Sequence, residues 1–150
     1  MKWDEYCPNG TTLEMDGDLS NSNPFPGEAE VVMIEGSTLP ECLLFFRDKG
    51  LLMTCDFIQQ IDGPSDEKIS NIKYGWFSNW VGHRIGFKGQ AVTPPLYAKR
   101  FTEGKSYSSI KTTAEKVQAL PYTTIISGHG PPIIKDAKEK RQEFMDSIKW

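Results

Sequence analysis

Two apolar runs joined by a short polar turn decide the fold of this chain: Glu41-Cys42-Leu43-Leu44-Phe45-Phe46-Arg47-Asp48-Lys49-Gly50-Leu51-Leu52-Met53-Thr54-Cys55-Asp56. The runs Glu41–Phe46 and Leu51–Cys55 are rich in β-forming residues, and the turn between them ends in glycine, which is typical of a β-hairpin. Both runs are apolar at successive positions, the pattern of strands that are buried on both faces. We therefore expect a sheet with a covering layer on each side.

Further strands and helices are expected on either side of this hairpin. β-type runs predict strands at Thr11–Met15, Glu30–Ile34 and Tyr122–Ser127. A helix is predicted from a cap at Ser106 or Ser108 to about Ala119. Its apolar stripe consists of Ile110, Ala114, Val117 and Leu120.

A second amphipathic helix is predicted at about Lys135–Lys149, and a shorter one could cover Trp76–Ile85. The apolar face of the Lys135–Lys149 helix would consist of Ile134, Ala137, Arg141, Phe144, Met145 and Ile148. Strands combined with amphipathic helices predict an α/β (α+β) layered domain. The 150 residues are enough for one domain with a hydrophobic core and too few for two, so residues 1–150 are expected to form a single domain.

The composition excludes several classes of partner. The net charge is −3 and the basic residues are scattered, which argues against nucleic-acid binding through a broad basic face. The apolar runs are far shorter than the roughly 20 residues of a membrane span. The chain has an odd number of cysteines, Cys7, Cys42 and Cys55, without CxxC spacing, so we expect a reduced, cytoplasmic protein. From the charge and the short apolar runs we expect neither a nucleic-acid nor a membrane partner.

Two side chains at strand ends are candidates for chemistry. His129 lies between two glycines after a β-run, where the backbone is free to approach a ligand closely. Asp56 ends the strand Leu51–Cys55, where a carboxylate needs a hydrogen-bonding, charged or metal partner. Local hydrogen bonding within a turn is the alternative for His129, and capping of the next turn is the alternative for Asp56.

Three other features are interpreted as structural. His83 fits a surface or partly buried helix position. Asp16–Ser20 resembles the start of a calcium loop, but loop positions 6 and 12 hold Asn21 and Gly27 where glycine and glutamate are needed. The aromatic stretch Tyr74–Trp80 could form a contact surface of a binding module, and ordinary core is the preferred interpretation.

Three patterns in order carry a resemblance to a known family. The first is Gly36-Ser37-Thr38-Leu39-Pro40-Glu41 before a strand, and the second is Gly50-Leu51-Leu52-Met53-Thr54-Cys55-Asp56. The third is Leu120-Pro121-Tyr122-Thr123-Thr124-Ile125-Ile126-Ser127-Gly128-His129-Gly130-Pro131-Pro132 before an amphipathic helix. Together they resemble the C-terminal half of metallo-β-lactamase superfamily proteins over about residues 28–149. The resemblance implies part of an αββα sandwich, with a mixed sheet flanked by helices.

The same resemblance implies an incomplete metal site. Asp56 matches the metal-bridging aspartate of that family, and His129 matches its last metal-binding histidine. Ser37 stands where the family has a ligand histidine, and Cys55 replaces the glycine before the aspartate. The His-x-His-x-Asp-His motif that supplies most ligands is absent. Because a catalytic zinc needs about three protein ligands, two matched ligands do not make a catalytic centre.

The sequence therefore predicts a catalytically degenerate metallo-β-lactamase-like protein, or a partial chain without a complete metal site, whose ligand is not specified. The alternative is a metal-dependent hydrolase whose remaining ligands come from a missing N-terminal half or a partner chain. No cofactor is predicted for this chain alone, and zinc, iron or manganese is expected only if further ligands are supplied. Because half a sandwich would expose an apolar sheet face, we also expect a homodimer or larger homo-oligomer.

Overall fold

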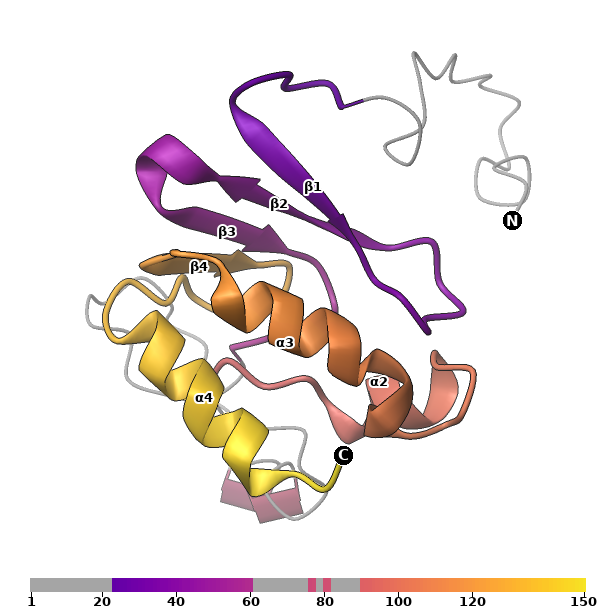
Figure 1. The fold of residues 1–150 in the computed structure, drawn as a ribbon. Coiled ribbons are helices and arrows are strands. Elements are labelled where there is room, and N and C mark those ends of the chain that lie inside the picture. The colour runs from indigo at the N-terminus through magenta and orange to yellow at the C-terminus, as the bar shows by residue number, and fades with distance from the viewer. Residues whose placement is uncertain (1–22, 61–75, 78–79, 82–89) are drawn as a thin grey trace, which may run out of the picture.

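A computed structural model describes residues 23–60, 76–77, 80–81 and 90–150 of the chain. Within these residues, one four-stranded mixed sheet packs with α-helices into an α/β domain (Figure 1). The strands are β1 (Ala29–Met33), β2 (Cys42–Phe46), β3 (Leu51–Thr54) and β4 (Thr124–Ser127). The helices are α2 (Pro95–Arg100), α3 (Lys111–Ala119) and α4 (Ala137–Ser147). The α/β class predicted from the sequence is thus confirmed.

The hairpin predicted from the central stretch is confirmed. β2 pairs antiparallel with β3, with Leu44 opposite Met53. The 3-10 turn Arg47–Lys49 joins them and ends at Gly50, whose φ of 56° lies in the left-handed region that glycine enters without strain. β1 adds antiparallel to β2, and this edge strand matches the predicted run Glu30–Ile34 to within one residue.

β4 completes the sheet on the other side of β3. It pairs with β3 in parallel, with Leu52 beside Ile125 and Thr54 beside Ser127. Parallel neighbours end at the same edge of a sheet, so the residues that follow β3 and β4 meet there. This pairing positions the candidate site.

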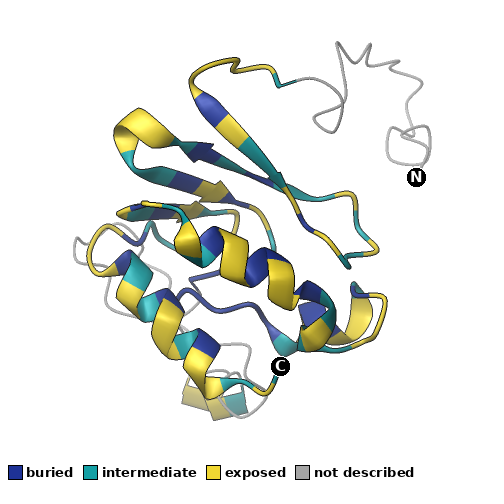
Figure 2. Cartoon of the chain, viewed as in Figure 1, coloured by how far each residue is buried: buried dark blue, intermediate teal, exposed yellow. Residues whose placement is uncertain are grey.

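The core lies between one face of the sheet and the helices α3 and α4, which lie side by side in Figure 1. The sheet contributes Leu43, Phe45, Leu52 and Ile125, all completely buried. From the predicted stripe of α3, Ile110, Ala114 and Val117 are buried and Leu120 packs against them, as Figure 2 shows for the inner face of this helix.

The opposite face of the sheet, called the outer face below, is apolar and partly exposed. Its cross-strand pairs place Val31, Leu44, Met53 and Ile126 in one row. Met53 is 39% exposed and Ile126 is 37% exposed. The expectation of a covering layer on both sides is therefore wrong for the part of the chain that the structure describes. The unbroken apolar runs arise because both faces are apolar, although the helices cover only one.

The helix starts differ in detail from the prediction. The Ser106 and Ser108 hydroxyls bond each other at 2.6 Å and neither caps the helix, which begins as a 3-10 turn at Tyr107–Ile110. α2 begins at Pro95, whose fixed φ suits the first position of a helix.

Two predicted elements fall on residues that are not fully described. The strand predicted at Thr11–Met15 lies outside the described residues, and of the helix predicted at Trp76–Ile85 only 76–77 and 80–81 are described, as helical. Among the described segments of the chain, no helix combines the length and apolarity that crossing a membrane requires.

Candidate functional site

Asp56 and His129 lie together at the edge of the sheet where β3 and β4 end. His129 Nε2 is 2.9 Å from Asp56 Oδ1, although the two residues are far apart in the sequence. The His129 side chain is 58% exposed and that of Asp56 is 38% exposed, so the pair faces solvent. The structure thus brings together the two residues that the sequence singled out. Their role as metal ligands stays a prediction.

Backbone contacts hold the turn that presents His129. Its N–H donates to Ser127 Oγ at 3.1 Å, and its carbonyl accepts from Gln60 N–H at 3.0 Å. Gly130 has a φ of 93°, and a Cβ built on it would lie 1.3 Å from the Gln60 carbonyl oxygen. The second glycine of Gly128-His129-Gly130 is therefore required by a close backbone approach.

A partly buried carboxylate, Glu41, positions the backbone at Asp56. Its Oε1 accepts hydrogen bonds from Asp56 N–H at 2.7 Å and Phe57 N–H at 3.0 Å. Its Oε2 accepts from the Tyr97 hydroxyl at 2.9 Å. Burial raises the pKa of the Glu41 carboxyl above its ordinary value, and these hydrogen bonds offset only part of that effect. Glu41 thus ties β2, α2 and the Asp56 turn together.

Ser37 belongs to the same hydrogen-bond network. Its hydroxyl lies 3.2 Å from the Tyr97 hydroxyl, donates to the Phe101 carbonyl at 3.0 Å, and accepts from Leu39 N–H at 3.1 Å. Burial raises the pKa of the Tyr97 hydroxyl, which keeps it a hydrogen-bond donor at neutral pH. At the position where the resemblance implies a ligand histidine, this chain therefore has a hydroxyl engaged in structural bonds.

Cys55 adds a thiol next to Asp56, without the features of a reactive one. Partial burial, followed by the negative charges of Glu41 and Asp56, raises the pKa of the Cys55 thiol. Reactive cysteines show the opposite shift, because the thiolate is the nucleophile. Cys55 is therefore a protonated thiol at neutral pH.

The donors among the described residues do not make up a catalytic metal centre. A catalytic zinc takes about three protein ligands and leaves one position open. The described residues contain no group of three or more His, Cys, Asp or Glu side chains placed to hold a metal ion. Asp56 and His129 supply two donors, and these donors bond each other.

Most of the other residues singled out in the sequence lie outside the described part of the chain, and for the aromatic stretch the prediction has to be corrected. His83, Cys7 and the Asp16–Ser20 turn lie outside the described residues. The interpretation of Tyr74–Trp80 as core is wrong for its described members, Trp76, Phe77 and Trp80. All three are exposed, Trp76 to 80%. The Trp76 and Phe77 rings meet edge to face, and the Phe77 ring stacks on that of Trp80.

Glu41 and Tyr97 were not predicted as part of the site. The hairpin contains a signal for Glu41, because the register that pairs Leu44 with Met53 places Glu41 opposite Asp56 when it is continued. Tyr97 has no comparable local signal, since it comes from α2, which is distant in the sequence.

Comparisons of this chain with protein-family models, with curated proteins and with solved structures find no match.

Proposed function

We propose that this chain is a catalytically degenerate metallo-β-lactamase-like module without a self-contained metal centre. One observation carries the proposal: Asp56 and His129, which match two ligands of that family, bond each other directly at 2.9 Å. The hydroxyl of Ser37, at a third ligand position, is engaged with Tyr97 and the Phe101 carbonyl. In this proposal Asp56, His129 and Ser37 hold the edge of the sheet together and bind no metal.

The layout of the described elements supports the family side of the proposal. A sheet with two helices on one face is what half of an αββα sandwich would contain. Asp56 and His129 follow adjacent parallel strands, an arrangement that gathers functional side chains at one edge. In this proposal the module acts by binding or assembly in the cytoplasm, where the Cys55 thiol stays reduced.

Elemental analysis tests the proposal. Protein purified without chelator should contain zinc, iron and manganese far below one equivalent per chain. Asp56→Ala and His129→Ala should leave the metal content unchanged, as should the control Asp48→Ala in the exposed turn after β2. Stoichiometric metal that is lost in both site variants and kept in the control would contradict the proposal.

The alternative is a metal-dependent hydrolase completed by a second polypeptide. One observation favours this alternative: the side chains of Asp56 and His129 are both exposed, so ligands from another chain could complete a site around them. Zinc titration followed by calorimetry distinguishes the two functions. Saturable binding that requires His129 and grows stronger with protein concentration would support a site shared between chains.

A second copy of the chain is the proposed partner on the outer face. Across the four strands, no charged residue belongs to the outer-face rows, so an identical apolar face is the complementary surface. Those rows consist of Ala29, Val31, Met33, Cys42, Leu44, Phe46, Leu51, Met53, Thr124 and Ile126. Burial of such a face in a two-fold dimer would remove apolar surface from water in both copies.

A further inference from the structure

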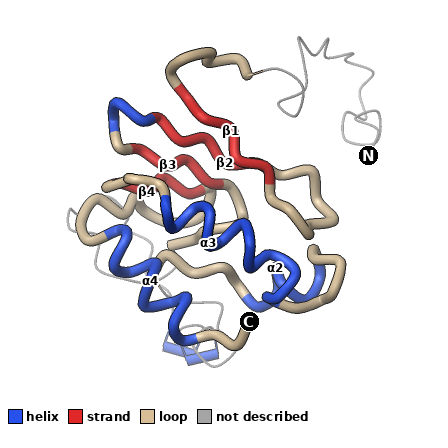
Figure 3. Tube along the Cα trace, viewed as in Figure 1, coloured by secondary structure: helices blue, strands red, loops and turns tan. Residues whose placement is uncertain are grey.

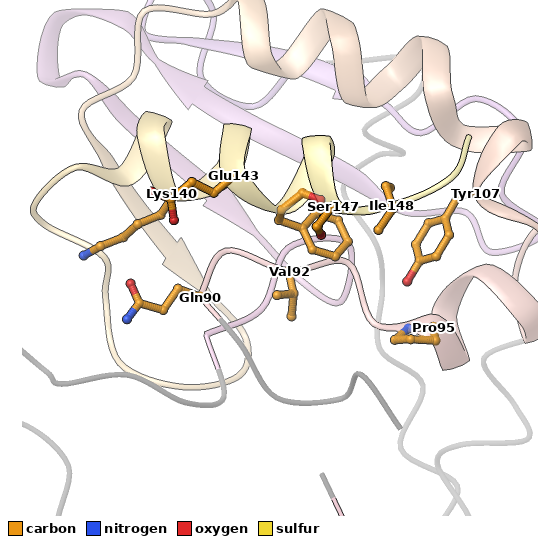
Figure 4. Close-up of a pocket in the computed structure, with 9 residues that line it drawn as sticks. Gln90, Val92, Pro95, Tyr107, Lys140, Glu143, Ser147 and Ile148 are labelled. Carbon is orange, nitrogen blue, oxygen red and sulfur yellow. Dashed lines mark hydrogen bonds between the residues drawn. The ribbon is translucent and has the colours of Figure 1, made fainter. Parts of the chain in front are cut away.

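A cavity of about 560 Å³ lies between α4 and residues 90–95, and neither Asp56 nor His129 lines it. Its walls are mixed: Val92, Pro95, Tyr107, Phe144 and Ile148 form the apolar part, and Gln90, Lys140, Glu143 and Ser147 form the polar part. Figure 4 shows Lys140 and Gln90 at one end of this cavity and Tyr107 with Pro95 at the other. The volume is in the range of roughly 300–1,000 Å³ that small-molecule sites occupy.

A buried cation, Arg141, lies directly behind the cavity wall. Arg141 is 0% exposed, and its Nη1 donates to the Ala91 carbonyl at 2.9 Å. Ala91 stands between Gln90 and Val92, which both line the cavity. The guanidinium carbon is 5.0 Å from the ring centroid of Phe144, another lining residue. The guanidinium thus contacts the Phe144 ring and the backbone of Ala91, although Arg141 itself does not line the cavity.

Two nitrogens of Arg141 are left without a hydrogen-bond partner. Within the described part of the chain, neither Nε nor Nη2 has an acceptor. These two N–H groups lie along the same edge of the planar guanidinium and form a fork that can bind both oxygens of a carboxylate. A buried guanidinium with an empty fork is costly, and an anion would remove that cost.

We propose that this cavity binds a small molecule with an apolar body and one carboxylate, which pairs with the Nε and Nη2 fork of Arg141. The body would lie against Val92, Tyr107 and Ile148. The carboxylate reaches the fork when the half-buried Phe144 ring turns aside, a side-chain motion that is fast compared with binding.

The surrounding charges favour an anion at this place. Lys140 and Glu143 both line the cavity and offset each other, so Arg141 is the unbalanced charge nearest to a ligand. The Tyr107 hydroxyl donates to the Thr93 carbonyl at 2.9 Å and is therefore already bonded. The site thus recognises charge through one group, the buried guanidinium.

Calorimetry with a matched pair of probes tests the proposal. 3-Phenylpropanoate carries the carboxylate on a short aromatic body, and 3-phenylpropanamide is its neutral counterpart. The carboxylate should bind saturably and the amide at least about tenfold more weakly, since charge-assisted bonds to the fork are lost. Equal affinity for the two probes, or no saturable binding of the carboxylate, would overturn the proposal.

Two variants locate the binding. Arg141→Met keeps a long side chain against Phe57 and Phe144 but removes the fork, and it should abolish the preference for the carboxylate. Arg100→Met, at an exposed position on α2, is the matched control and should bind like the wild type.

Ser147→Trp fills the cavity from an exposed position and should abolish binding without disturbing the core. If Arg141→Met does not fold, Ser147→Trp decides the question. Carboxylate binding that persists in Ser147→Trp would place the ligand elsewhere and overturn the proposal.

Discussion

Glu41 is the residue that most directly fixes the backbone at Asp56. Glu41→Ala would leave Asp56 N–H, Phe57 N–H and the Tyr97 hydroxyl without their shared acceptor. Because each partly buried donor without a partner costs on the order of 1 kcal/mol, we expect a loss of about 2–3 kcal/mol in the free energy of unfolding. Urea unfolding followed by circular dichroism measures this loss. A loss below that of the exposed control Glu28→Ala would contradict the role given to Glu41.

The raised pKa of the Glu41 carboxyl makes the free energy of unfolding depend on pH. Its pKa is raised in the folded chain, so the folded state binds more protons than the unfolded state between the ordinary and the raised pKa. The contribution of Glu41 is therefore fully present below its ordinary pKa and falls as pH rises through the raised one. Unfolding of wild type and Glu41→Gln across acidic pH tests this sign. The advantage of wild type over the variant should be largest at the lowest pH, and the opposite trend would contradict the burial argument.

The turn between β4 and α4 depends on Gly130. Gly130→Ala combines a positive φ with a Cβ placed 1.3 Å from the Gln60 carbonyl oxygen, so the two segments would have to separate. We expect the free energy of unfolding to fall by more than about 2 kcal/mol, since the cost of the strained conformation and the cost of the displaced backbone add together. The matched control is Gly27→Ala, where φ is 82° but no atom lies within 4 Å of the added Cβ. Gly27→Ala should lower the free energy of unfolding by only about 1 kcal/mol, because only its positive φ is unfavourable. Equal losses in thermal unfolding of the two variants would show that the contact with Gln60 contributes nothing.

Elements with strong local patterns could be predicted from the sequence. The hairpin of β2 and β3 follows from two β-rich runs around a turn that ends in Gly50, and the stripe of α3 follows from helical spacing. The meeting of Asp56 with His129 was expected only through the family resemblance, because the parallel pairing of β3 with β4 joins distant segments. The role of Ser37 could not be predicted, since two of its three partners, Tyr97 and Phe101, come from α2 and the residue that follows α2.

At the scale of the whole molecule, sequence pattern alone does not distinguish a covered sheet face from an uncovered one. Leu44 and Met53 are as apolar as Leu43 and Leu52, yet only the second pair is completely buried. Apolar residues lie on both faces, and within the described residues the helices cover only one of them. Burial of the second face in an assembly of two copies is the proposal that follows. The prediction of strands buried on both faces is wrong for the part of the chain that the structure describes, and it leads to an expectation about association.

Association through the outer face predicts a homodimer that one added charge will disrupt. Met53 lies in the middle of that face and is 39% exposed, so Met53→Lys should leave the fold intact and make dimer formation unfavourable. Sedimentation equilibrium at micromolar concentration should show a dimer for the wild type and a monomer for Met53→Lys. Leu96→Lys is the matched control, because Leu96 is an apolar residue of α2, 48% exposed and outside the sheet, and it should remain dimeric. A monomeric wild type would rule out a second copy as the partner on the outer face, and dimers in all three proteins would place the interface on another surface.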